Sequence, residues 1–526
     1  MSPLQDHVAE LVATYGAPDA GATHLLCRRH RPDAVAVTVV EPDLSSRDLT
    51  FGELDDTAAR LAGGLAGLGV GPGDRVATLM GKSAELVTTL LAIWRIGAVH
   101  VPLFTAFAPP AIAARTAGTG VVVADAGQRA KLDGLGLRVV VASGPVQRTD
   151  VALADLLLAD PVEPVAVGGD GTLIELFTSG TTGAPKAVPI PLRAVAGMHA
   201  YHDYGLHHTD DDVFWNAADP GWAYGLYYAI VGPLATGRRS LLLHAGFSAE
   251  LTWQVLARFG VTNFTAGPTV YRALRSAGLP VPDGLRLRCC SSAGEPLTPD
   301  VVDWAERELG VSVRDHYGQT ETGMTVANAW HPDLIDDVGP GSMGRALPGW
   351  TIEILDGDSP APDRTTGRVA VDLAHSPLMA FTGYRDAPER TAERFTPDGR
   401  WYLTGDVGSR AVDGRLAFGS RDDDIILMAG YRIGPFEVER VLTRHPAVLE
   451  AAVVGEPDEL RGEVVVAHVV LRDPAAGGDA LVDELQQLVR TELAAHLYPR
   501  RVYVTDALPR TPSGKVQRFA LRPATP

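Results

Sequence analysis

The stretch Leu176-Phe-Thr-Ser-Gly-Thr-Thr-Gly-Ala-Pro-Lys186 joins the end of an apolar run to a glycine-rich loop and a cation. The run Leu173 to Phe177 predicts a short buried strand. The two glycines of the loop let the backbone turn tightly and approach a ligand closely. Its hydroxyl side chains and successive backbone amides can form an anion-binding nest, and Lys186 adds a positive charge. Together these residues predict a loop that holds a polyphosphate.

This loop is not a P-loop of the G-x-x-x-x-G-K-[ST] type, because only two residues separate Gly180 from Gly183 and Pro185 precedes the lysine. Taken alone, it could equally be a solvated turn between strands. The complete string T-S-G-T-T-G-x-P-K, however, resembles the phosphate loop of the AMP-forming adenylate-forming superfamily, which comprises acyl-CoA synthetases, adenylation domains and luciferases. The resemblance implies ATP-binding roles for Thr178, Ser179, Gly180, Thr181, Thr182, Gly183 and Lys186.

The length and net charge of the chain limit the number of domains and the kinds of binding partner that are expected. A chain of 526 residues exceeds one ordinary hydrophobic core, so we expect two or more domains. The formal net charge is -18, from 46 Lys and Arg residues against 64 Asp and Glu residues. An acidic protein has no general attraction for nucleic acid or anionic lipid, so neither is expected as a partner. An anionic substrate must therefore meet locally placed cations.

Signals for export or membrane insertion are weak. The cysteines, Cys27, Cys289 and Cys290, show neither a metal-ligand spacing nor an evident disulfide framework. The N-terminal residues lack a basic region followed by an apolar core, so no signal peptide is predicted. The most apolar long stretch, Leu86 to Phe104, is interrupted by Arg95, so no membrane span is predicted. We expect a cytoplasmic protein and leave its oligomeric state open.

Strand patterns alternate with amphipathic helix patterns through much of the chain. Thr50 begins a capped helix that continues to Leu68, and Ser83 to Gly97 forms another helix. Short strands are predicted over residues 121–124, 213–216, 240–244, 261–265 and 286–290. This alternation predicts an α/β fold with mostly parallel sheets covered by helices.

The pattern changes after Gly344, where strands broken by Gly, Pro and Asp predict a smaller β-rich unit. A further α+β segment begins near Asp423, and its last helix is predicted over Leu481 to Leu497. We therefore predict a large N-terminal domain over residues 1–422, built from two helix-layered α/β sheets and the β-rich unit. Residues 423–526 are predicted to form a small α+β C-terminal domain.

The segment Asp315-His-Tyr-Gly-Gln-Thr-Glu-Thr-Gly323 is most simply a polar loop after a strand at Val311 to Val313. Glu321 offers a hard oxygen ligand for Mg²⁺, and Tyr317 an aromatic face for a base. The segment matches the superfamily's Y-G-x-T-E string, and Ala293-Gly-Glu-Pro296 resembles the loop that lies against adenine. The resemblance extends the expected ATP site to Gly294, Glu295, Pro296, Asp315, His316, Tyr317, Gln319 and Thr320, with Glu321 as the metal ligand.

Two later strings also resemble the superfamily. Tyr402-Leu-Thr-Gly-Asp406 places a carboxylate on a glycine turn and matches the T-G-D string that binds ribose. The stretch Ser420 to Glu439 resembles the hinge and the loop after it, although Ser420 replaces the usual glycine. The resemblance implies a ribose contact by Asp406, ribose or phosphate contacts by Arg421 and Arg432, a hinge at Asp423, and a CoA path along Ala429, Gly430 and Tyr431.

The string Leu508-Pro-Arg-Thr-Pro-Ser-Gly-Lys515 completes the set. Alone, Lys515 would be a surface residue near a tail. In context it resembles the catalytic lysine of the superfamily, and Arg510 keeps the charge of a lysine usual at its position. Because the strings occur in order over nearly the whole chain, the sequence is identified as a member of the superfamily. It is most similar to the acetyl- and medium-chain acyl-CoA synthetase branch.

The resemblance implies a two-step reaction. ATP and Mg²⁺ activate a carboxylic acid to acyl-AMP with release of pyrophosphate, and Lys515, Thr320 and Glu321 are the expected catalytic residues. Because charge builds on phosphate oxygens, catalysis is expected to consist of positioning and electrostatic stabilisation. The mobile C-terminal domain then turns about Asp423, Lys515 withdraws, and the thiol of CoA attacks the acyl group to release AMP.

Three alternatives stay open. The acceptor could be the phosphopantetheine of a carrier protein instead of free CoA. A specialised relative could pass the adenylate to an amine, or could activate an unusual oxyanion such as nitrite. A non-catalytic nucleotide sensor would need broken motifs, whereas Lys515, Glu321 and Asp406 are all present.

The resemblance also bears on the size of the acid. Short-chain acetyl-CoA synthetases carry a tryptophan just before Gln-Thr-Glu, where this chain has Gly318. With Ala293 also small, we expect an acyl pocket deeper than acetate needs, with further walls from Trp222, Ala223 and Tyr224. Each buried methylene contributes ~0.8 kcal/mol, which favours a medium-chain, branched or aromatic acid. Gly318→Trp is then expected to shift the preference toward acetate or propionate, provided that the ring fits.

The expected hinge gives a first testable prediction. Asp423→Pro restricts φ and removes a backbone N–H, so the variant should keep adenylation but lose much of the thioester-forming step. The two half-reactions are measured separately, by pyrophosphate release and by transfer from supplied acyl-AMP. Unchanged overall turnover would argue against a rotation about this residue.

Overall fold

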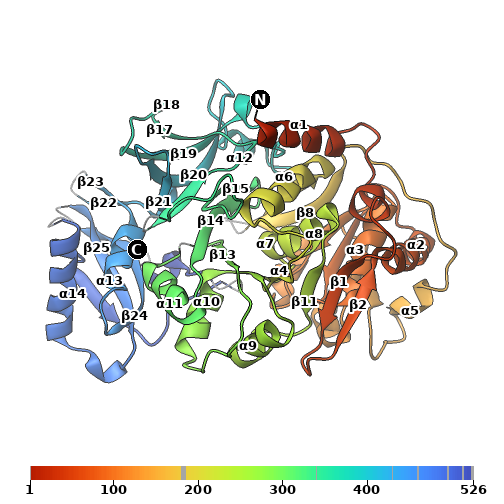
Figure 1. Ribbon diagram of the computed structural model, residues 1–526, viewed down its shortest axis with the longest axis horizontal. Helices are drawn as coiled ribbons and strands as arrows, with labels where there is room; N and C mark the ends of the chain where they lie inside the picture. The colour runs from red at the N-terminus through yellow and green to blue at the C-terminus, as the bar shows by residue number, and fades with distance from the viewer. Residues whose placement is uncertain are drawn as a thin grey trace.

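The computed structural model describes residues 2–178, 185–295, 297–338, 341–428, 431–458, 461–494, 497–511 and 515–522, without the side chains of Tyr431 and Arg432. Within these residues the chain forms two α/β sheets with packed helices, a β-rich unit and a C-terminal α+β unit (Figure 1). The predicted α/β class is confirmed, and so is the presence of a large N-terminal part and a smaller C-terminal part.

The first sheet carries the phosphate loop at its edge. Its strands pair in parallel except for the last two, which are antiparallel. Their order is β7 (Val151–Ala152), β6 (Arg138–Val141), β5 (Val121–Ala124), β3 (Arg75–Leu79), β4 (Val99–Pro102), β8 (Thr172–Thr178) and β9 (Lys186–Pro191). Thr178 and Lys186 are paired residues of β8 and β9, so the ends of the phosphate loop are held together.

The second sheet passes from parallel to antiparallel pairing. Its parallel part and first hairpin run in the order β2 (Ser46–Thr50), β1 (Val35–Val40), β11 (Ser240–Leu243), β10 (Phe214–Asn216), β12 (Asn263–Ala266), β13 (Cys289–Ala293), β14 (Val313–Gln319) and β15 (Gly323–Ala327). The β2–β1 and β14–β15 pairs are antiparallel, and the strands between are parallel.

The β-rich unit continues this sheet through antiparallel strands. They follow in the order β16 (Ser342–Ala346), β21 (Leu416–Arg421), β20 (Trp401–Arg410), β19 (Thr366–Asp372), β17 (Ile352–Asp356) and β18 (Ser359–Pro360). Strand β21, which pairs with β20, leads directly into η7 (Asp422–Asp424) and the C-terminal unit.

Helices cover both sheets, and local sequence explains several of their ends. Thr50 and Glu53 form a reciprocal capping box at α2, and Ser83 caps α3. The longer α-helices of the first 422 residues are α1 (Pro3–Tyr15), α2 (Phe51–Gly67), α3 (Ala84–Arg95), α4 (Pro109–Arg115), α6 (Val195–Ala200), α9 (Ala249–Arg258), α10 (Pro268–Ser276) and α11 (Pro299–Leu309). Short α-helical turns are α5 (Leu153–Leu156), α7 (Ala223–Gly225), α8 (Gly232–Thr236) and α12 (Pro388–Ala392).

Tighter or wider helical turns join these elements. Two π-helical turns, η4 (Tyr201–Gly205) and η5 (Leu226–Val231), flank the parallel strands, and π-helical turns are frequent at functional sites. A further π-helical turn is η1 (His24–Arg28), and the tighter 3₁₀ turns are η2 (Ala126–Leu132), η3 (Leu192–Ala194), η6 (Leu373–His375), η7 (Asp422–Asp424), η8 (Pro474–Ala476) and η9 (Arg518–Leu521).

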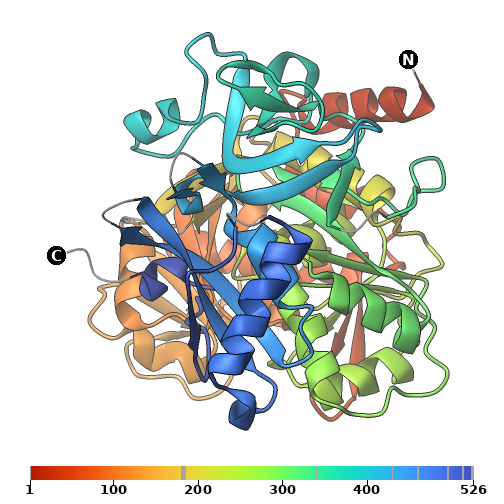
Figure 2. The same ribbon diagram turned by 90° about the vertical axis from the view of Figure 1, so that its left-hand side faces the viewer.

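The C-terminal unit packs beside the rest of the chain and has its own apolar core (Figure 2). Its sheet runs β23 (Tyr431–Ile433), β22 (Ile426–Met428), β25 (Gly462–Leu471) and β24 (Val448–Asp458), and β26 (Arg501–Val504) pairs with β25. Helices α13 (Pro435–Leu442) and α14 (Asp479–Glu492) contribute apolar side chains to that core.

Three local expectations were wrong. The predicted loop around Asp315 is part of β14, because Val313 to Gln319 pairs with β13 and β15. Asp406 lies within β20 rather than on a free turn, next to Gly405, whose φ is 74°. The helix expected to reach Leu497 ends at Glu492. In the first two cases, long-range pairing extends a strand through residues that favour turns locally.

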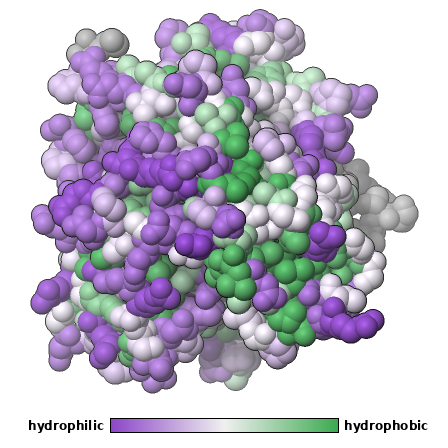
Figure 3. Space-filling model, turned by 90° about the vertical axis from the view of Figure 1, so that its right-hand side faces the viewer, coloured by the Kyte–Doolittle hydropathy of each residue, from purple (hydrophilic) through white to green (hydrophobic). Residues whose placement is uncertain are grey.

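One face of the molecule, at the side of α2 and α5, shows apolar patches among hydrophilic residues (Figure 3). Leu158, directly after α5, is 83% exposed. In the described part of the chain, no helix has the length and apolar character needed to cross a membrane.

Candidate active site

The expected site residues come from the edges of both sheets and from the C-terminal unit. Lys186 starts β9, Tyr317 and Gln319 end β14, and Asp406 and Arg421 belong to the paired strands β20 and β21. Ser179, Gly180, Thr181, Thr182, Gly183, Pro296, Ala429 and Gly430 lie outside the described residues, as do the side chains of Tyr431 and Arg432.

A buried carboxylate, Asp406, joins these elements. Oδ2 accepts hydrogen bonds from Tyr317 Oη at 2.5 Å and Gln319 Nε2 at 2.7 Å, and Oδ1 accepts one from Arg421 Nη1 at 3.1 Å. Burial raises the pKa of Asp406, while the Arg421 charge and the Tyr317 hydroxyl oppose that rise. Its partners are thus the residues that the resemblance assigned to adenine and ribose.

Glu321, in the turn between β14 and β15, belongs to a second cluster, which also contains Lys186 at the start of β9. Its Oε1 accepts a hydrogen bond from Tyr384 Oη at 2.7 Å, and Arg394 Nε donates to the same hydroxyl at 3.1 Å. Lys186 Nζ lies 4.9 Å from the centre of the Tyr384 ring. Burial lowers the pKa of Lys186, and the charges of Arg394 and Arg390 lower it further.

This cluster fits a divalent cation with phosphate. Oε2 of Glu321 has no donor within the described chain, so it remains open to a hard metal ion, and Mg²⁺ prefers such carboxylate oxygens. Lys186 and Arg394 provide the nearby positive charge that phosphate oxygens require. Tyr227 Oη donates to the carbonyl oxygen of Thr320 at 3.0 Å and so holds the adjacent backbone.

Lys515 reaches this region from the C-terminal unit. Its Nζ lies 5.8 Å from the centre of the Trp222 ring, within range of a cation–π contact. The residue is exposed by its accessible surface, and desolvation by the protein around its ammonium lowers its pKa. The carboxylates of Glu295, Asp406 and Glu321 oppose that decrease, whereas Arg421 adds to it.

Gly294 and Glu295 are the described residues of the loop that is expected to lie against adenine. Gly294 has a φ of 96°, and a Cβ there would lie 3.4 Å from the Trp222 ring, so glycine suits both the backbone and the close packing. Glu295 accepts hydrogen bonds from Arg272 Nη2 at 2.6 Å and from Thr269 Oγ1 at 3.1 Å. Trp222 is therefore close to both this loop and Lys515.

The expected acyl-pocket residues are more tightly packed than the sequence suggested. Ala293 and Tyr224 are buried, whereas Trp222 and Ala223 are partly exposed. The hydroxyls of Tyr224 and Tyr201 lie 3.1 Å apart, and Tyr201 Oη lies 2.6 Å from His316 Nδ1. Burial lowers the pKa of His316 to about 3, so its ring is neutral. His316 thus packs against the tyrosines beneath the expected acyl pocket.

Asp315, beside His316, is in a comparable environment. Burial raises its pKa to about 8, although backbone N–H groups of Leu297 and His316 act in the opposite direction. A carboxyl group with such a pKa is largely protonated at neutral pH, so it can donate a hydrogen bond as well as accept one.

The expected hinge lies where the β-rich unit ends. Asp423 belongs to η7, between β21 and the first strand of the C-terminal sheet, and its Oδ1 lies 3.5 Å from Arg421 Nε. Just beyond, Arg518 donates to Glu439 at 2.8 Å and to Asp424 at 3.3 Å. These contacts tie the segment after Lys515 to the start of the C-terminal unit.

Comparison with known proteins agrees with this geometry. A model of the AMP-binding enzyme family matches residues 26–384, and one of the AMP-binding enzyme C-terminal domain matches residues 437–515. The chain belongs to the AMP-binding enzyme family. It is therefore an AMP-forming acid–thiol ligase. The expected use of ATP, Mg²⁺ and CoA is confirmed at the level of the family.

Individual relatives support the assignment. Acetyl-coenzyme A synthetase of Bacillus subtilis is 34% identical over 490 residues, covering 90% of this chain and 84% of its own. The crystal structure of an acyl-CoA synthetase from Brucella canis is 41% identical, with a TM-score of 0.77 over 98% of this chain and 96% of its own. An anthranilate CoA ligase with bound anthranoyl-AMP is 26% identical, with a TM-score of 0.86 over 96% of this chain and 97% of its own. Other curated relatives, an acyl-CoA ligase and an acyl-coenzyme A synthetase among them, align with this chain over only 59% to 64% of their own length.

Three contributors to the site escaped the sequence reasoning: Tyr384, Arg394 and Tyr201. They lie outside the recognised strings, and only the packing of distant elements brings them to Glu321 and His316. Their side-chain types gave no local signal, since tyrosine and arginine are common at ordinary surface and core positions.

Tyr384→Phe tests the support of Glu321. The variant loses the hydroxyl that donates to Glu321 and accepts from Arg394, and a hydrogen bond to a charged group contributes about 1.5–3 kcal/mol. We expect at least about a tenfold decrease in kcat/KM for adenylation and a higher Mg²⁺ requirement. The exposed Tyr503 provides the control Tyr503→Phe. Equal activities of the two variants would contradict this role.

The expectation for Gly318→Trp required that the ring fits, and the packing around Gly318 argues against that fit. A Cβ at Gly318 would lie 2.1 Å from the carbonyl oxygen of Gly323 and 2.6 Å from Met324 Cα, both backbone atoms of the paired strand β15. A side chain here would displace β15 rather than fill an acyl pocket, so the depth of the pocket does not follow from this glycine.

Gly318→Ala is therefore expected to destabilise the β14–β15 hairpin, with an overpacking cost of about 1–3 kcal/mol, and to leave acid preference unchanged. Gly120→Ala is the control, because a Cβ there meets no atom within 4 Å. Thermal unfolding and relative rates for two acids measure the effects. A shift toward acetate without loss of stability would restore the original pocket hypothesis.

Proposed function

We propose that this enzyme activates a carboxylic acid larger than acetate and transfers the acyl group to CoA. The observation that carries the proposal is the position of Lys515, whose ammonium faces Trp222 amid the charges of Glu295, Asp406 and Glu321. A cation held in this way suits a step in which negative charge gathers on a carboxylate and a phosphate.

Each residue has a proposed part in adenylation. Lys515 neutralises the oxygens of the acid and of the α-phosphate, because a positioned cation stabilises the negative charge that develops there. Asp406 accepts hydrogen bonds from the ribose hydroxyls, and Tyr317 borders the adenine. Glu321 would hold Mg²⁺, which neutralises phosphate charge when bound, and Thr320 offers its hydroxyl to phosphate. The Thr178–Lys186 loop, with Ser179, Gly180, Thr181, Thr182 and Gly183, is proposed to hold the other phosphates.

The second step is proposed to use a rotation about Asp423. Support comes from the position of Asp423 between β21 and β22, and from the separate apolar core of residues 426–521. As long as Lys515 stays beside Trp222, the C-terminal unit covers that side of the site. Its withdrawal would expose the acyl group to the thiol, along a path lined by Ala429, Gly430 and Tyr431.

The proposed acid is medium-chain, branched or aromatic. Trp222 and Ala223 are partly exposed next to Tyr224, and an aromatic wall favours apolar acids through buried area and ring stacking. The similarity to an anthranilate CoA ligase supports an aromatic acid. The similarity to an acetyl-coenzyme A synthetase makes acetate the rival substrate.

Two rival acceptors remain. A carrier protein would use the same adenylation residues, and so would an amine acceptor, since one solved relative is described as an amide bond synthetase. Activation of an oxyanion such as nitrite is a further specialised option. The sequence resemblance to CoA synthetases favours free CoA.

A panel of acids tests the proposal directly. Acetate, butyrate, octanoate, isovalerate, benzoate and anthranilate are incubated with ATP and Mg²⁺, with and without CoA, and products are identified by mass spectrometry. We expect acyl-CoA from at least one longer or aromatic acid at a kcat/KM well above that of acetate. Preference for acetate overturns the proposed acid class, and acyl-AMP that accumulates equally with and without CoA overturns the proposed acceptor.

Lys515→Ala separates the two steps. Removal of the ammonium is expected to lower adenylation by several orders of magnitude while thioester formation from supplied acyl-AMP largely survives, because that step uses the other domain orientation. Lys131, whose ammonium contacts the carbonyl oxygen of Thr105, provides the control Lys131→Ala. Loss of both steps in a folded Lys515→Ala protein would contradict the division of labour.

A further inference from the structure

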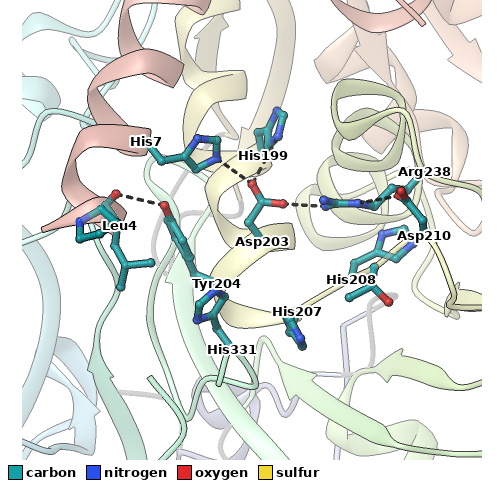
Figure 4. A pocket seen from close by; sticks show the side chains of 12 residues that line it. Leu4, His7, His199, Asp203, Tyr204, His207, His208, Asp210, Arg238 and His331 are labelled. Atoms are coloured by element: carbon teal, nitrogen blue, oxygen red, sulfur yellow. Dashed lines mark hydrogen bonds and ion pairs between the residues drawn. The ribbon is translucent and has the colours of Figure 1, made fainter. Parts of the chain in front are cut away.

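A pocket of about 530 Å³ lies apart from the active-site residues, where α1 meets α6 and η4 (Figure 4). Its wall carries five histidines together with Asp203, Asp210 and Arg238. None of these residues belongs to the strings that carry the nucleotide chemistry, so the pocket needs an explanation of its own.

Three ligand atoms converge in this pocket. His7 Nε2 lies 3.0 Å and His199 Nε2 3.4 Å from Oδ2 of Asp203, and all three atoms lie within 4.8 Å of one another. Two ligands bound at 2.0–2.1 Å to a tetrahedral zinc ion lie about 3.3 Å apart. The two histidine–aspartate separations match a common metal centre, and the two histidine nitrogens lie within 4.8 Å of each other.

We propose that His7, His199 and Asp203 bind one divalent transition-metal ion, with Zn²⁺ as the preferred ion, and that the ion clamps helix α1 to α6 and η4. Two imidazoles and one carboxylate form a donor set that suits zinc better than Mg²⁺ or Ca²⁺, which prefer oxygen ligands. The site is distinct from the Mg²⁺ site expected at Glu321.

The fold holds the ligands in place from both sides. His199 and Asp203 are four residues apart, on the same face of the continuous α6–η4 segment. His7 projects from α1, which Val8, Leu11 and Tyr15 anchor in the core. Tyr204 Oη donates to the carbonyl oxygen of Leu4 at 3.0 Å and fixes the start of that helix.

Neighbouring groups suit metal-bound ligands. Tyr15 Oη lies 3.0 Å from His199 Nδ1, so Nδ1–H can donate to it and leave Nε2 free for a metal. Arg238 Nη1 donates to Oδ1 of Asp203 at 2.6 Å and leaves Oδ2 facing the two histidines. Hydrogen bonds of this kind commonly orient the ligands of a metal site.

Nearby carboxylates offset part of the positive charge. Arg238 lines the pocket, and Arg29, which donates to Tyr15 Oη, is a second cation close to His199. Asp203 is joined by Glu10, 3.7 Å from His7 Nδ1, and by Asp210, 3.4 Å from Arg238 Nε. These three carboxylates compensate three of the four positive charges of the proposed ion and the two guanidinium groups.

The site remains open on the pocket side. The side chain of His7 is 39% exposed, and those of His199 and Asp203 are 14% exposed. An ion can therefore enter, and a water molecule from the pocket can complete the coordination. Three protein ligands with one open position form an accessible centre rather than a closed structural one.

The test uses tag-free full-length protein, treated with a chelator and then dialysed. Co²⁺ is added first, because a tetrahedral centre with nitrogen ligands gives strong visible absorption whereas an octahedral oxygen site absorbs weakly. Zn²⁺ is then added to displace it, and calorimetry gives the stoichiometry. We expect one tight Zn²⁺ site per chain, loss of the cobalt spectrum on Zn²⁺ addition, and slower proteolysis of the α1 segment with Zn²⁺ bound.

His7→Ala and His199→Ala are expected to weaken binding by about 100-fold or more, since loss of an outer hydrogen-bond partner alone costs 10–100-fold. His7→Ala is the decisive variant because its partly exposed side chain tolerates truncation. His445→Ala is the matched control: His445 Nε2 lies 3.3 Å from Glu484, and the described part of the chain offers this histidine–carboxylate pair no third ligand. Absence of tight Zn²⁺ binding to the wild type, or equal binding by the His7 and His445 variants, overturns the proposal.

Discussion

The hydrogen-bonded carboxylate of Asp406 is the contact on which the active site depends. It lies on β20, and its partners come from β14 and β21, so one buried group connects the α/β sheet, the β-rich unit and the segment that leads into the C-terminal unit. A buried carboxylate is costly without such partners. With Tyr317, Gln319 and Arg421 in place it is satisfied, and the residues expected around a nucleotide are oriented before any ligand arrives.

The second organising feature is the approach of Lys515 to the N-terminal domain. The lysine comes from the C-terminal unit, whereas Trp222 and the surrounding carboxylates belong to elements hundreds of residues earlier. Burial disfavours its charge, and three carboxylates favour it. The carboxylates thus reduce, without cancelling, the cost of placing the charged group there.

The α6–η4 segment links the active site to the histidine-rich pocket. Tyr201, on its inner face, contacts Tyr224 and His316, while His199 and Asp203 face α1. One short helical segment therefore supports the wall of the expected acyl pocket and presents the proposed metal ligands. A clamp between α1 and this segment would hold that wall from behind.

The order of the sequence strings by itself determined the superfamily, the α/β class and the division into a large and a small part, and it predicts which residues react. These follow from local patterns: glycines and hydroxyls in the phosphate loop, the Thr50 cap, and apolar periodicity in strands and helices. Tertiary structure alone decided where side chains point and which distant groups meet. Asp315 to Gln319 became a strand because β13 and β15 pair with it, and a Cβ at Gly318 meets the backbone of β15. Tyr384, Arg394 and the His7–His199–Asp203 cluster depend on contacts between residues far apart in the chain, which no local pattern encodes.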